Sequence, residues 1–404
     1  MSKLGRLSDS PKADEWEFSA AEYRRRVEKA RSLMKQAGIA CMLLTSDKNL
    51  RYLAGESSRL LTISNTRPRY IIFPVEKEPI AVWPSVFVSG FQRTSWVSDI
   101  RSWPSPRPAD EGVTLVVEAL RECLKPGDQL GVEIGPESRL GMSFNDFMTI
   151  REKLAPTKFV DAGRLMQLVR MVKCGEEVER MRRACDIVCG AFEWLPTVLR
   201  PGLSGQDVND ALKRKMLELG ASSIDYLVPT SGADTYDQCT TGPGLRGLGK
   251  GDVLYTDVGA TWRGYFCDCN RNWAIGRAST EVADAYKRVY DATQVTIDTL
   301  KPGQTAADIC RAMAKAINPG MEGDPPSGRM GHGVGMEITE SPSLASQDKT
   351  VIEAGMVLAI EPGLYLANSK EGRFRRMLHE ENVVVTQRGC ELLTRRASPT
   401  LIEV

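Results

Sequence analysis

The stretch that decides the fold is VLYTDVGATWRGYFCDCNRNW, which runs from Val253 to Trp273. Two strand-like runs flank a turn bounded by glycines, so the stretch predicts an antiparallel β-hairpin. Paired residues in such a hairpin have a constant index sum, and a turn centred on Trp262–Arg263 pairs Asp257 with Asp268. Two carboxylates opposite each other destabilise a sheet unless they share a proton or a cation. The hairpin therefore predicts a cation site, with a solvent-facing strand pair as the ordinary alternative.

The cysteines and the overall charge exclude several classes of protein. Successive side chains of a strand alternate between faces, so Cys267 and Cys269 should lie opposite to Asp268, in the core. The ten cysteines include no C-x-x-C pair, and 404 residues can bury a core without disulfides, which favours reduced thiols in the cytoplasm. Lys and Arg total 53 against 52 Asp and Glu, so no charge excess points to nucleic acid or an anionic membrane surface. The sequence shows no apolar stretch of membrane-spanning length and no apolar signal core near its start.

The second half of the chain contains an internal repeat. The segment from Gly251 to Gly259 has a near-copy from Gly355 to Gly363, each with a glycine, an apolar strand, a carboxylate and then x-Gly. A second pair of similar segments, 199–208 and 300–309, places a Ser or Thr where a helix N-cap belongs. Two duplicated halves would form a pseudo-twofold α+β domain with one carboxylate from each half near the axis.

The second half also supplies further candidate ligands. Glu361 is the repeat counterpart of Asp257, and the run HEENVVVT offers Glu380 or Glu381, between which the strand period cannot choose. His332 lies between two glycines, which let the backbone approach closely and aim one imidazole. A set of carboxylates with one imidazole suits two divalent cations better than a cysteine-rich zinc site does.

The N-terminal part alternates helix and strand patterns. Residues 20–36 predict a helix, and residues 69–75 and 79–83 predict two strands, as expected for an α/β domain. We predict a flexible segment over residues 1–17, an α/β domain over 18–163 and the metal-binding domain over 164–404, opened by a long helix over 176–199.

The ordered segments TDVGATWRGYFCDCNRNW, GHGVG, AIEPG and EENVVVT resemble the metal-binding blocks of the pita-bread family, which contains methionine aminopeptidase, prolidase, aminopeptidase P and creatinase. The segments KNLRYLAG and MQLVRMVKCGEEVERMRRAC are similar to the two-domain prolidase and creatinase branch. The resemblance implies an α+β fold with a creatinase-like N-terminal α/β domain and a pseudo-twofold catalytic domain. It also implies a homodimer and two divalent metal ions (Mn, Fe, Co or Zn). The ligands that it implies are Asp257, Asp268, His332, Glu361 and Glu380.

The chain departs from the family's peptidases at their proton-handling histidines. Thr339 stands seven residues after His332, where those peptidases have a histidine, and Thr240 stands near the place of a second one. The chain has only one other histidine, His379. Since the missing histidines bind and protonate peptides in the family, peptide cleavage here needs another proton carrier.

The favoured function is a dinuclear metal hydrolase that resembles Xaa-Pro peptidases and cleaves a C–N bond of a small peptide, with Glu361 as proton carrier and Thr339 as a further catalytic candidate. Asp237, Thr240 and Glu340 are candidate substrate contacts. The alternative is a lyase for a small zwitterionic metabolite, similar to the family's dimethylsulfoniopropionate lyases, which also lack those histidines. A non-catalytic binding module is the third possibility, and five retained ligands argue against it. No nucleic-acid or membrane partner is expected.

Overall fold

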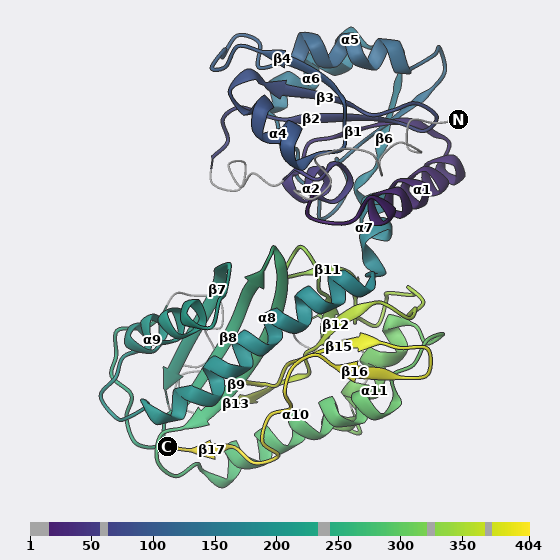
Figure 1. Cartoon of the computed structure of the whole chain (residues 1–404). Helices are drawn as coiled ribbons and strands as arrows, with labels where there is room; N and C mark the ends of the chain where they lie inside the picture. The colour runs from purple at the N-terminus through teal and green to yellow at the C-terminus, as the bar shows by residue number, and fades with distance from the viewer. Residues whose placement is uncertain (1–15, 57–63, 233–242, 321–327, 368–373) are drawn as a thin grey trace. The chain divides into compact units, whose positions relative to one another are not determined.

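The computed structural model describes residues 16–56, 64–232, 243–320, 328–367 and 374–404, in two compact units, Met1–Val169 and Arg170–Val404 (Figure 1). The first unit contains one six-stranded sheet in the order β4-β3-β2-β1-β5-β6. Its elements are α1 (Ala20–Ala37), β1 (Ile39–Leu44), α2 (Asp47–Ala54), β2 (Tyr70–Pro74), β3 (Ile80–Pro84), α4 (Val88–Thr94), β4 (Asp99–Trp103), α5 (Val113–Cys123), β5 (Gln129–Val132), α6 (Phe144–Lys153) and β6 (Lys158–Asp161). Helix α7 (Gly163–Met171) follows, and the predicted domain boundary after residue 163 stays a prediction.

Local sequence explains how this unit begins. Ser19 caps α1 by accepting a hydrogen bond from the Glu22 N–H at 3.2 Å, and Gly38 ends the helix in the left-handed conformation at φ 68°. The buried face of the helix includes Val27 and Met34. This confirms the helix predicted over residues 20–36, and β2 and β3 confirm the two predicted strands.

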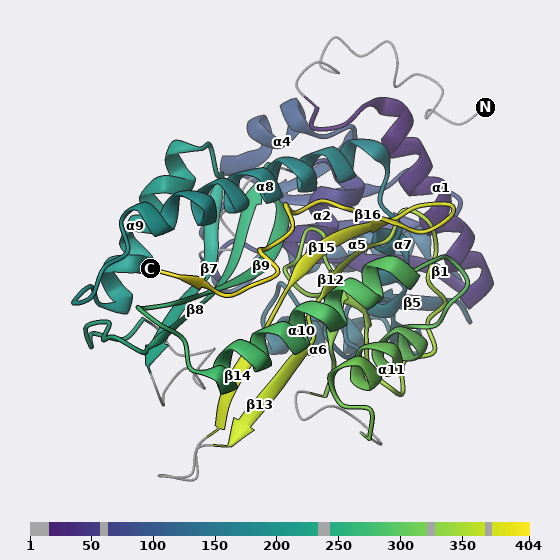
Figure 2. The same cartoon turned by 90° about the horizontal axis from the view of Figure 1, so that it is seen from below.

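The second unit contains three sheets, in the orders β17-β9-β8-β7, β11-β10-β12-β15-β16 and β13-β14. Its helices are α8 (Gly175–Trp194), α9 (Gly205–Glu218), α10 (Thr280–Thr299) and α11 (Ala306–Ile317). Its strands are β7 (Ser223–Gly232), β8 (Val253–Trp262), β9 (Tyr265–Ala274), β10 (Gly331–Gly333), β11 (Glu340–Ser343), β12 (Val357–Ile360), β13 (Gly363–Ala367), β14 (Phe374–Leu378), β15 (Glu381–Val385), β16 (Cys390–Leu392) and β17 (Ile402–Glu403). Helix α8 lies along β8 and β9 (Figures 1 and 2).

The long helix that opens this unit ends earlier than predicted. It ends at Trp194, and a short 3-10 turn, Leu195–Thr197, replaces its predicted last residues. Pro196 lies inside this turn and cannot donate the backbone hydrogen bond that a continuing helix requires.

The internal repeat is visible in how its helices start. Ser204 caps α9 and Thr305 caps α11, and each forms a reciprocal capping box with the aspartate three residues later. Both cap residues also form an isolated β-bridge, Ser204 with Gly247 and Thr305 with Val351. The two halves therefore repeat the same helix-entry structure, and they supply Asp257 and Glu361 from equivalent strands.

The decisive hairpin is present, but its predicted register is wrong by two residues. Trp262 pairs with Tyr265, so Asp268 lies opposite Gly259 rather than opposite Asp257. The turn consists of Arg263 and Gly264, which both have positive φ, 48° and 76°. Such a two-residue turn matches the twist of the flanking strands, and glycine adopts its conformation without steric cost. Because the shift is even, Asp257 and Asp268 still share one face as diagonal neighbours.

The opposite face of β9 faces the core, as predicted. Cys267 and Cys269 are fully buried, and their thiols contact those of Cys185 and Cys189 on α8. The cysteines in the described ranges are all free thiols. Within the same ranges, no helix is long and apolar enough to cross a membrane.

Candidate metal centre

Five side chains from five places in the second unit meet at one point. Asp257 comes from β8, Asp268 from β9, His332 from β10, and Glu361 and Glu380 follow β12 and β14. One ligand atom each of Asp268, His332 and Glu380 lies within 4.8 Å of the other two. The Nε2 atom of His332 lies 3.5 Å from Asp268 Oδ2 and 3.7 Å from Glu361 Oε2. Asp257 is the fifth member, since its charge acts on Glu380 and that of Glu361 acts on it.

The glycines beside His332 fix where its ring can go. A Cβ on Gly331, at φ 136°, would lie 2.2 Å from the Ala359 carbonyl oxygen, and one on Gly333 would lie 2.3 Å from the Ser341 oxygen. The strand therefore lies close to both neighbours, β12 and β11. The Nδ1 of His332 lies 3.0 Å from the Gly333 carbonyl, to which it donates, and this leaves the Nε2 lone pair toward the carboxylates.

Replacing Gly331 with alanine should therefore weaken metal binding without unfolding the protein. The added methyl group would push β10 away from β12 and turn the His332 imidazole from its carboxylate partners. We expect metal affinity to fall about 10-fold or more, the range for losing the support of a metal ligand. Competition against a fluorescent chelator measures this, with Gly320→Ala, whose site has no close backbone neighbour, as the matched control. Equal affinity in both variants would contradict the account.

The carboxyl groups of the cluster are buried close together, so a bound cation would stabilise their charged forms. Burial and the charge of Glu361 raise the pKa of Asp257 to about 7. Burial and neighbouring carboxylates also raise the pKa of Asp268 and of Glu380 well above the usual range. Asp257 Oδ1 and both carboxyl oxygens of Glu380 are buried without a hydrogen-bond partner among the described residues. Buried acceptors are rarely left in this state, so these oxygens fit cation ligands.

Two residues that the sequence reading missed support the cluster. Arg376 on β14 donates from Nη2 to Glu361 Oε1 at 3.1 Å, and its charge lowers the pKa of Asp257. Asn382 is fully buried and clamps the backbone of Asp268, accepting from its N–H at 2.9 Å and donating to its carbonyl at 2.6 Å. Two consecutive arginines interrupt the apolar residues of β14, and they were the available signal for Arg376. No feature of the sequence pointed to Asn382, which follows the two glutamates.

The structure separates Glu380 from Glu381. The Glu381 carboxylate accepts from Arg271 at 2.9 Å and from Arg396 at 3.0 Å, on the side of the strand away from the cluster. His379 is also fully buried outside the cluster, with Nδ1 at 3.1 Å from Thr293 Oγ1 and Nε2 at 3.2 Å from Arg396 Nη1. His379 therefore does not replace the missing peptidase histidines.

The remaining predicted catalytic and substrate-binding residues differ in their hydrogen bonds and burial. Thr339 Oγ1 accepts from Arg329 Nη2 at 3.4 Å, and the charge of Arg329 offsets a small part of the rise that burial causes in the pKa of Asp268. Glu340 is buried and ion-paired with Lys173 at 3.0 Å and with Arg170 at 3.4 Å, which favours a role in holding its loop. Whether Thr339 and Glu340 touch substrate stays a prediction. Asp237 and Thr240 lie outside the described residues.

Comparison with known proteins agrees with this geometry. Residues 26–172 match the creatinase/prolidase N-terminal domain, and residues 179–387, more than half of the chain, match metallopeptidase family M24. The chain belongs to metallopeptidase family M24. The expected fold, a creatinase-like domain followed by a pita-bread domain, is thereby confirmed.

Three relatives of this M24 protein cover between 69% and 96% of its length. An uncharacterized peptidase, YqhT, of Bacillus subtilis is 26% identical over 93% of this chain and 99% of its own. The Xaa-Pro dipeptidase of Pyrococcus furiosus is 27% identical over 69% of this chain and 77% of its own. The crystal structure of dipeptidase PepE from Mycobacterium ulcerans is similar at a TM-score of 0.82 and 25% identity, over 96% of this chain and 99% of that one.

Proposed function

We propose that this M24 protein is a dinuclear divalent-metal hydrolase that cleaves a C–N bond in a short peptide or peptide-like substrate. The observation that carries the proposal is the cluster of four carboxylates and one imidazole, with buried carboxyl oxygens that have no hydrogen-bond donor in the part of the chain that the structure describes. The dipeptidases and Xaa-Pro dipeptidases among its relatives support a peptide substrate. These relatives are named as peptidases, which favours the hydrolase over the lyase alternative.

The roles of the residues follow from their positions. Asp257, Asp268, His332, Glu361 and Glu380 would hold the cations. Divalent cations in such a site supply Lewis-acid activation of a water molecule and of a substrate carbonyl. His332 is set to offer Nε2, because its Nδ1 donates to the Gly333 carbonyl. The guanidinium of Arg376 orients the Glu361 carboxylate through the hydrogen bond to Oε1.

Proton transfer is assigned to a carboxyl group in this proposal. Thr339 cannot titrate near neutral pH, and His379 is engaged with Thr293 and Arg396. Glu361 is less buried than the other carboxylates, at 15% exposure of its side chain, and Arg376 holds one of its oxygens. Glu361 therefore fits the role of the group that takes a proton from water and delivers it to the leaving nitrogen.

Metal removal and a substrate panel test the proposal together. Dialysis against a chelator should abolish hydrolysis, and adding back Mn²⁺, Co²⁺, Zn²⁺ or Fe²⁺ one at a time should restore it and identify the metal. Xaa-Pro dipeptides and matched Xaa-Ala dipeptides should be assayed beside a sulfonium and a betaine. Release of free proline or alanine that requires metal is the expected result. Release of a volatile sulfide with no peptide hydrolysis would contradict the proposal and favour the lyase.

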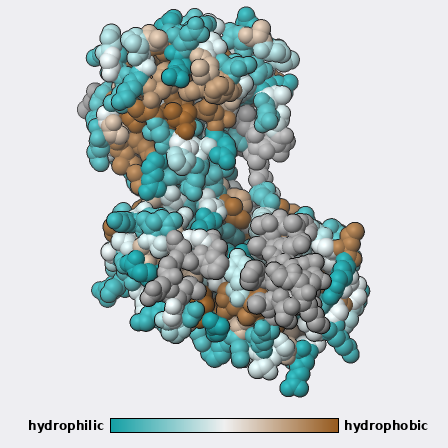
Figure 3. All heavy atoms as spheres, turned by 180° about the vertical axis from the view of Figure 1, so that it is seen from behind, coloured by the Kyte–Doolittle hydropathy of each residue, from teal (hydrophilic) through white to brown (hydrophobic). Residues whose placement is uncertain are grey.

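The assembly and location belong to the same proposal. We include a homodimer, as the family resemblance implies, and a location in the cytoplasm, as the cysteine pattern favours. On the face seen in Figure 3 the N-terminal unit shows a patch of apolar surface, which is the character of surface that protein interfaces cover. One chain has a mass of 44.6 kDa, and a single species of twice that mass in sedimentation equilibrium would support the dimer.

A further inference from the structure

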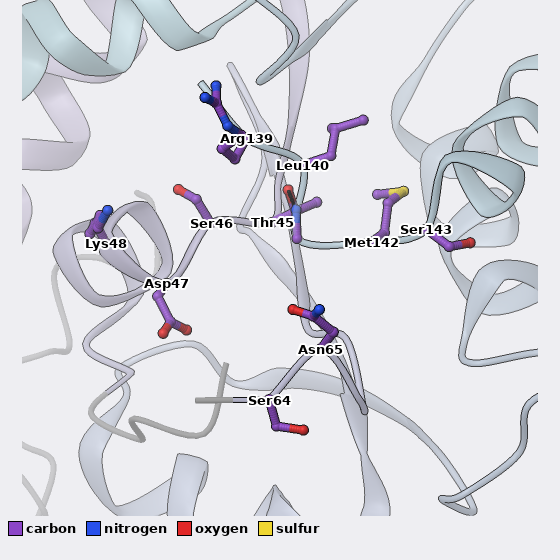
Figure 4. A pocket seen from close by; sticks show the side chains of 11 residues that line it. Thr45, Ser46, Asp47, Lys48, Ser64, Asn65, Arg139, Leu140, Met142 and Ser143 are labelled. Atoms are coloured by element: carbon purple, nitrogen blue, oxygen red, sulfur yellow. Dashed lines mark hydrogen bonds between the residues drawn. The ribbon is translucent and has the colours of Figure 1, made fainter. Parts of the chain in front are cut away.

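The N-terminal unit contains a cavity of about 680 Å³ at the carboxyl ends of β1 and β5 (Figure 4). Three stretches line it, 45–48, 64–65 and 139–143, all within the unit Met1–Val169. The volume falls in the range of about 300–1,000 Å³ in which proteins bind small molecules. None of the metal-centre residues contributes to it.

The sheet topology places this cavity where α/β sheets bind ligands. Strands β1 and β5 are parallel neighbours. After β1 the chain passes through α2 to β2 on one side, and after β5 it passes through α6 to β6 on the other. Strand β2 runs antiparallel to β1, whereas β1, β5 and β6 are parallel. The cavity lies outside the carboxyl ends of these parallel strands, which is the general position of ligand sites in open α/β sheets.

Buried polar contacts fix the wall of the crevice. Glu133 is 2% exposed, and its carboxylate accepts from the N–H groups of Thr45 at 2.6 Å and Ser46 at 3.0 Å. It also accepts from the Ser46 hydroxyl at 2.6 Å and the Asn49 amide at 2.5 Å. From the other side, the Gly141 N–H donates to Thr45 Oγ1 at 2.9 Å, and a Cβ on Gly141 would lie 2.1 Å from the Thr45 carbonyl oxygen. The two loops are therefore locked together before any ligand arrives, which lowers the cost of binding.

The lining has the chemistry of a site for an organic anion. Arg139, Ser46 and Lys48 lie toward the left of the view in Figure 4, and Leu140 and Met142 lie toward the right. The two cations outnumber the single acid of the lining, Asp47. Arg139 Nη1 donates to the Ser138 carbonyl at 2.8 Å, which orients a guanidinium suited to a two-oxygen group. The apolar side chains of the lining, Leu140 and Met142, offer a contact surface for the carbon skeleton of the ligand.

We propose that this crevice binds a metabolite-sized organic anion whose carboxylate or phosphate group is held by Arg139. The shared chemistry is an oxyanion head on a small organic body. The inference concerns the N-terminal unit and does not depend on the hydrolase activity proposed for the other unit.

Hydrogen-exchange mass spectrometry on the full-length protein can test this site locally. The probes are L-malate for a carboxylate head, glycerol 3-phosphate for a phosphate head and glycerol as the neutral control. Peptides that cover residues 44–50 and 136–146 report on the crevice, and peptides around residues 257–268 report separately on any anion at the metal centre. The variants are Arg139→Gln and, as a matched exposed arginine of the same unit outside the cavity, Arg107→Gln.

We expect saturable protection of the crevice peptides by one or both anions, none with glycerol, and affinity weakened about 10-fold or more in Arg139→Gln only. Protection by malate alone assigns a carboxylate head, and protection by glycerol 3-phosphate alone assigns a phosphate head. Unchanged exchange elsewhere in ligand-free Arg139→Gln shows that its fold is intact. No protection by either anion up to about 10 mM, well above a millimolar Kd, or equal protection in Arg139→Gln, would overturn the proposal.

Discussion

Replacing Asp257 with asparagine should abolish metal-dependent hydrolysis while leaving the fold intact. The change removes a negative charge at the centre of the cluster but keeps the shape of the side chain. Metal catalysis contributes several kcal/mol of transition-state stabilisation, so we expect the rate to fall about 10³-fold or more. The measurement is kcat at saturating metal, together with metal content after gel filtration.

The same variant should be more stable than the parent when both are free of metal. Burial and the charge of Glu361 work against the Asp257 carboxylate, and asparagine removes this repulsion. We expect the Tm of the metal-free variant to exceed that of the metal-free parent by about 2 °C or more. A variant that keeps full turnover, or that loses stability without metal, would contradict the placing of Asp257 among the metal ligands.

Replacing Lys173 with methionine should cause the largest loss of stability. The ammonium group lies 3.0 Å from Glu340 Oε2, and the two side chains are only 2% and 4% exposed. Removing Lys173 leaves the buried Glu340 carboxylate with only the longer ion pair to Arg170, at 3.4 Å, and breaking a buried pair costs about 3–5 kcal/mol. Because Glu340 also accepts from the N–H groups of Met336 and Glu337, we expect the loop after His332 to loosen. Urea unfolding measures the loss in the free energy of unfolding.

A matched control separates burial from charge. Lys287 and Asp291 form a 2.6 Å ion pair whose side chains are 67% and 50% exposed, and Lys287→Met should cost less than about 1 kcal/mol. The double variant Lys173→Met with Glu340→Leu should recover most of the stability that the single change loses, since no charge stays unpaired. Equal losses for Lys173→Met and Lys287→Met would contradict the account of this pair.

The pH dependence of the Lys173 effect has a definite sign. Burial alone would raise the pKa of Glu340, but the charges of Lys173 and Arg170 outweigh it and lower that pKa. A lowered pKa contributes stability that is present above the unfolded value, about 4.3, and is lost as pH falls through the folded value. The stability difference between the parent and Lys173→Met should therefore shrink at acid pH.

The parts of the molecule that depend on local pattern could be predicted from the sequence. Helix α1 follows from its apolar spacing between Ser19 and Gly38, and both capping boxes follow from the repeated segments. The β8–β9 hairpin could be predicted, but its register could not, because Arg263 rather than Trp262 begins the two-residue turn. The error did no harm to the site, since an even shift keeps both aspartates on one face.

What the sequence could not predict depends on long-range contacts. The choice between Glu380 and Glu381 is made by Arg271 and Arg396, which hold Glu381 on the other side. Glu340 stays a predicted substrate contact, but its ion pair with Lys173, far away in the sequence, could not be predicted from the local pattern. The anion crevice has no sequence motif at all, because its three lining stretches meet only when the sheet forms.

The most direct test of the central claim is a crystal of the protein grown with Mn²⁺ and measured at the manganese absorption edge. The account predicts two anomalous peaks in the second unit, surrounded by Asp257, Asp268, His332, Glu361 and Glu380. Metal bound elsewhere, or none at these five side chains at saturating Mn²⁺, would contradict it.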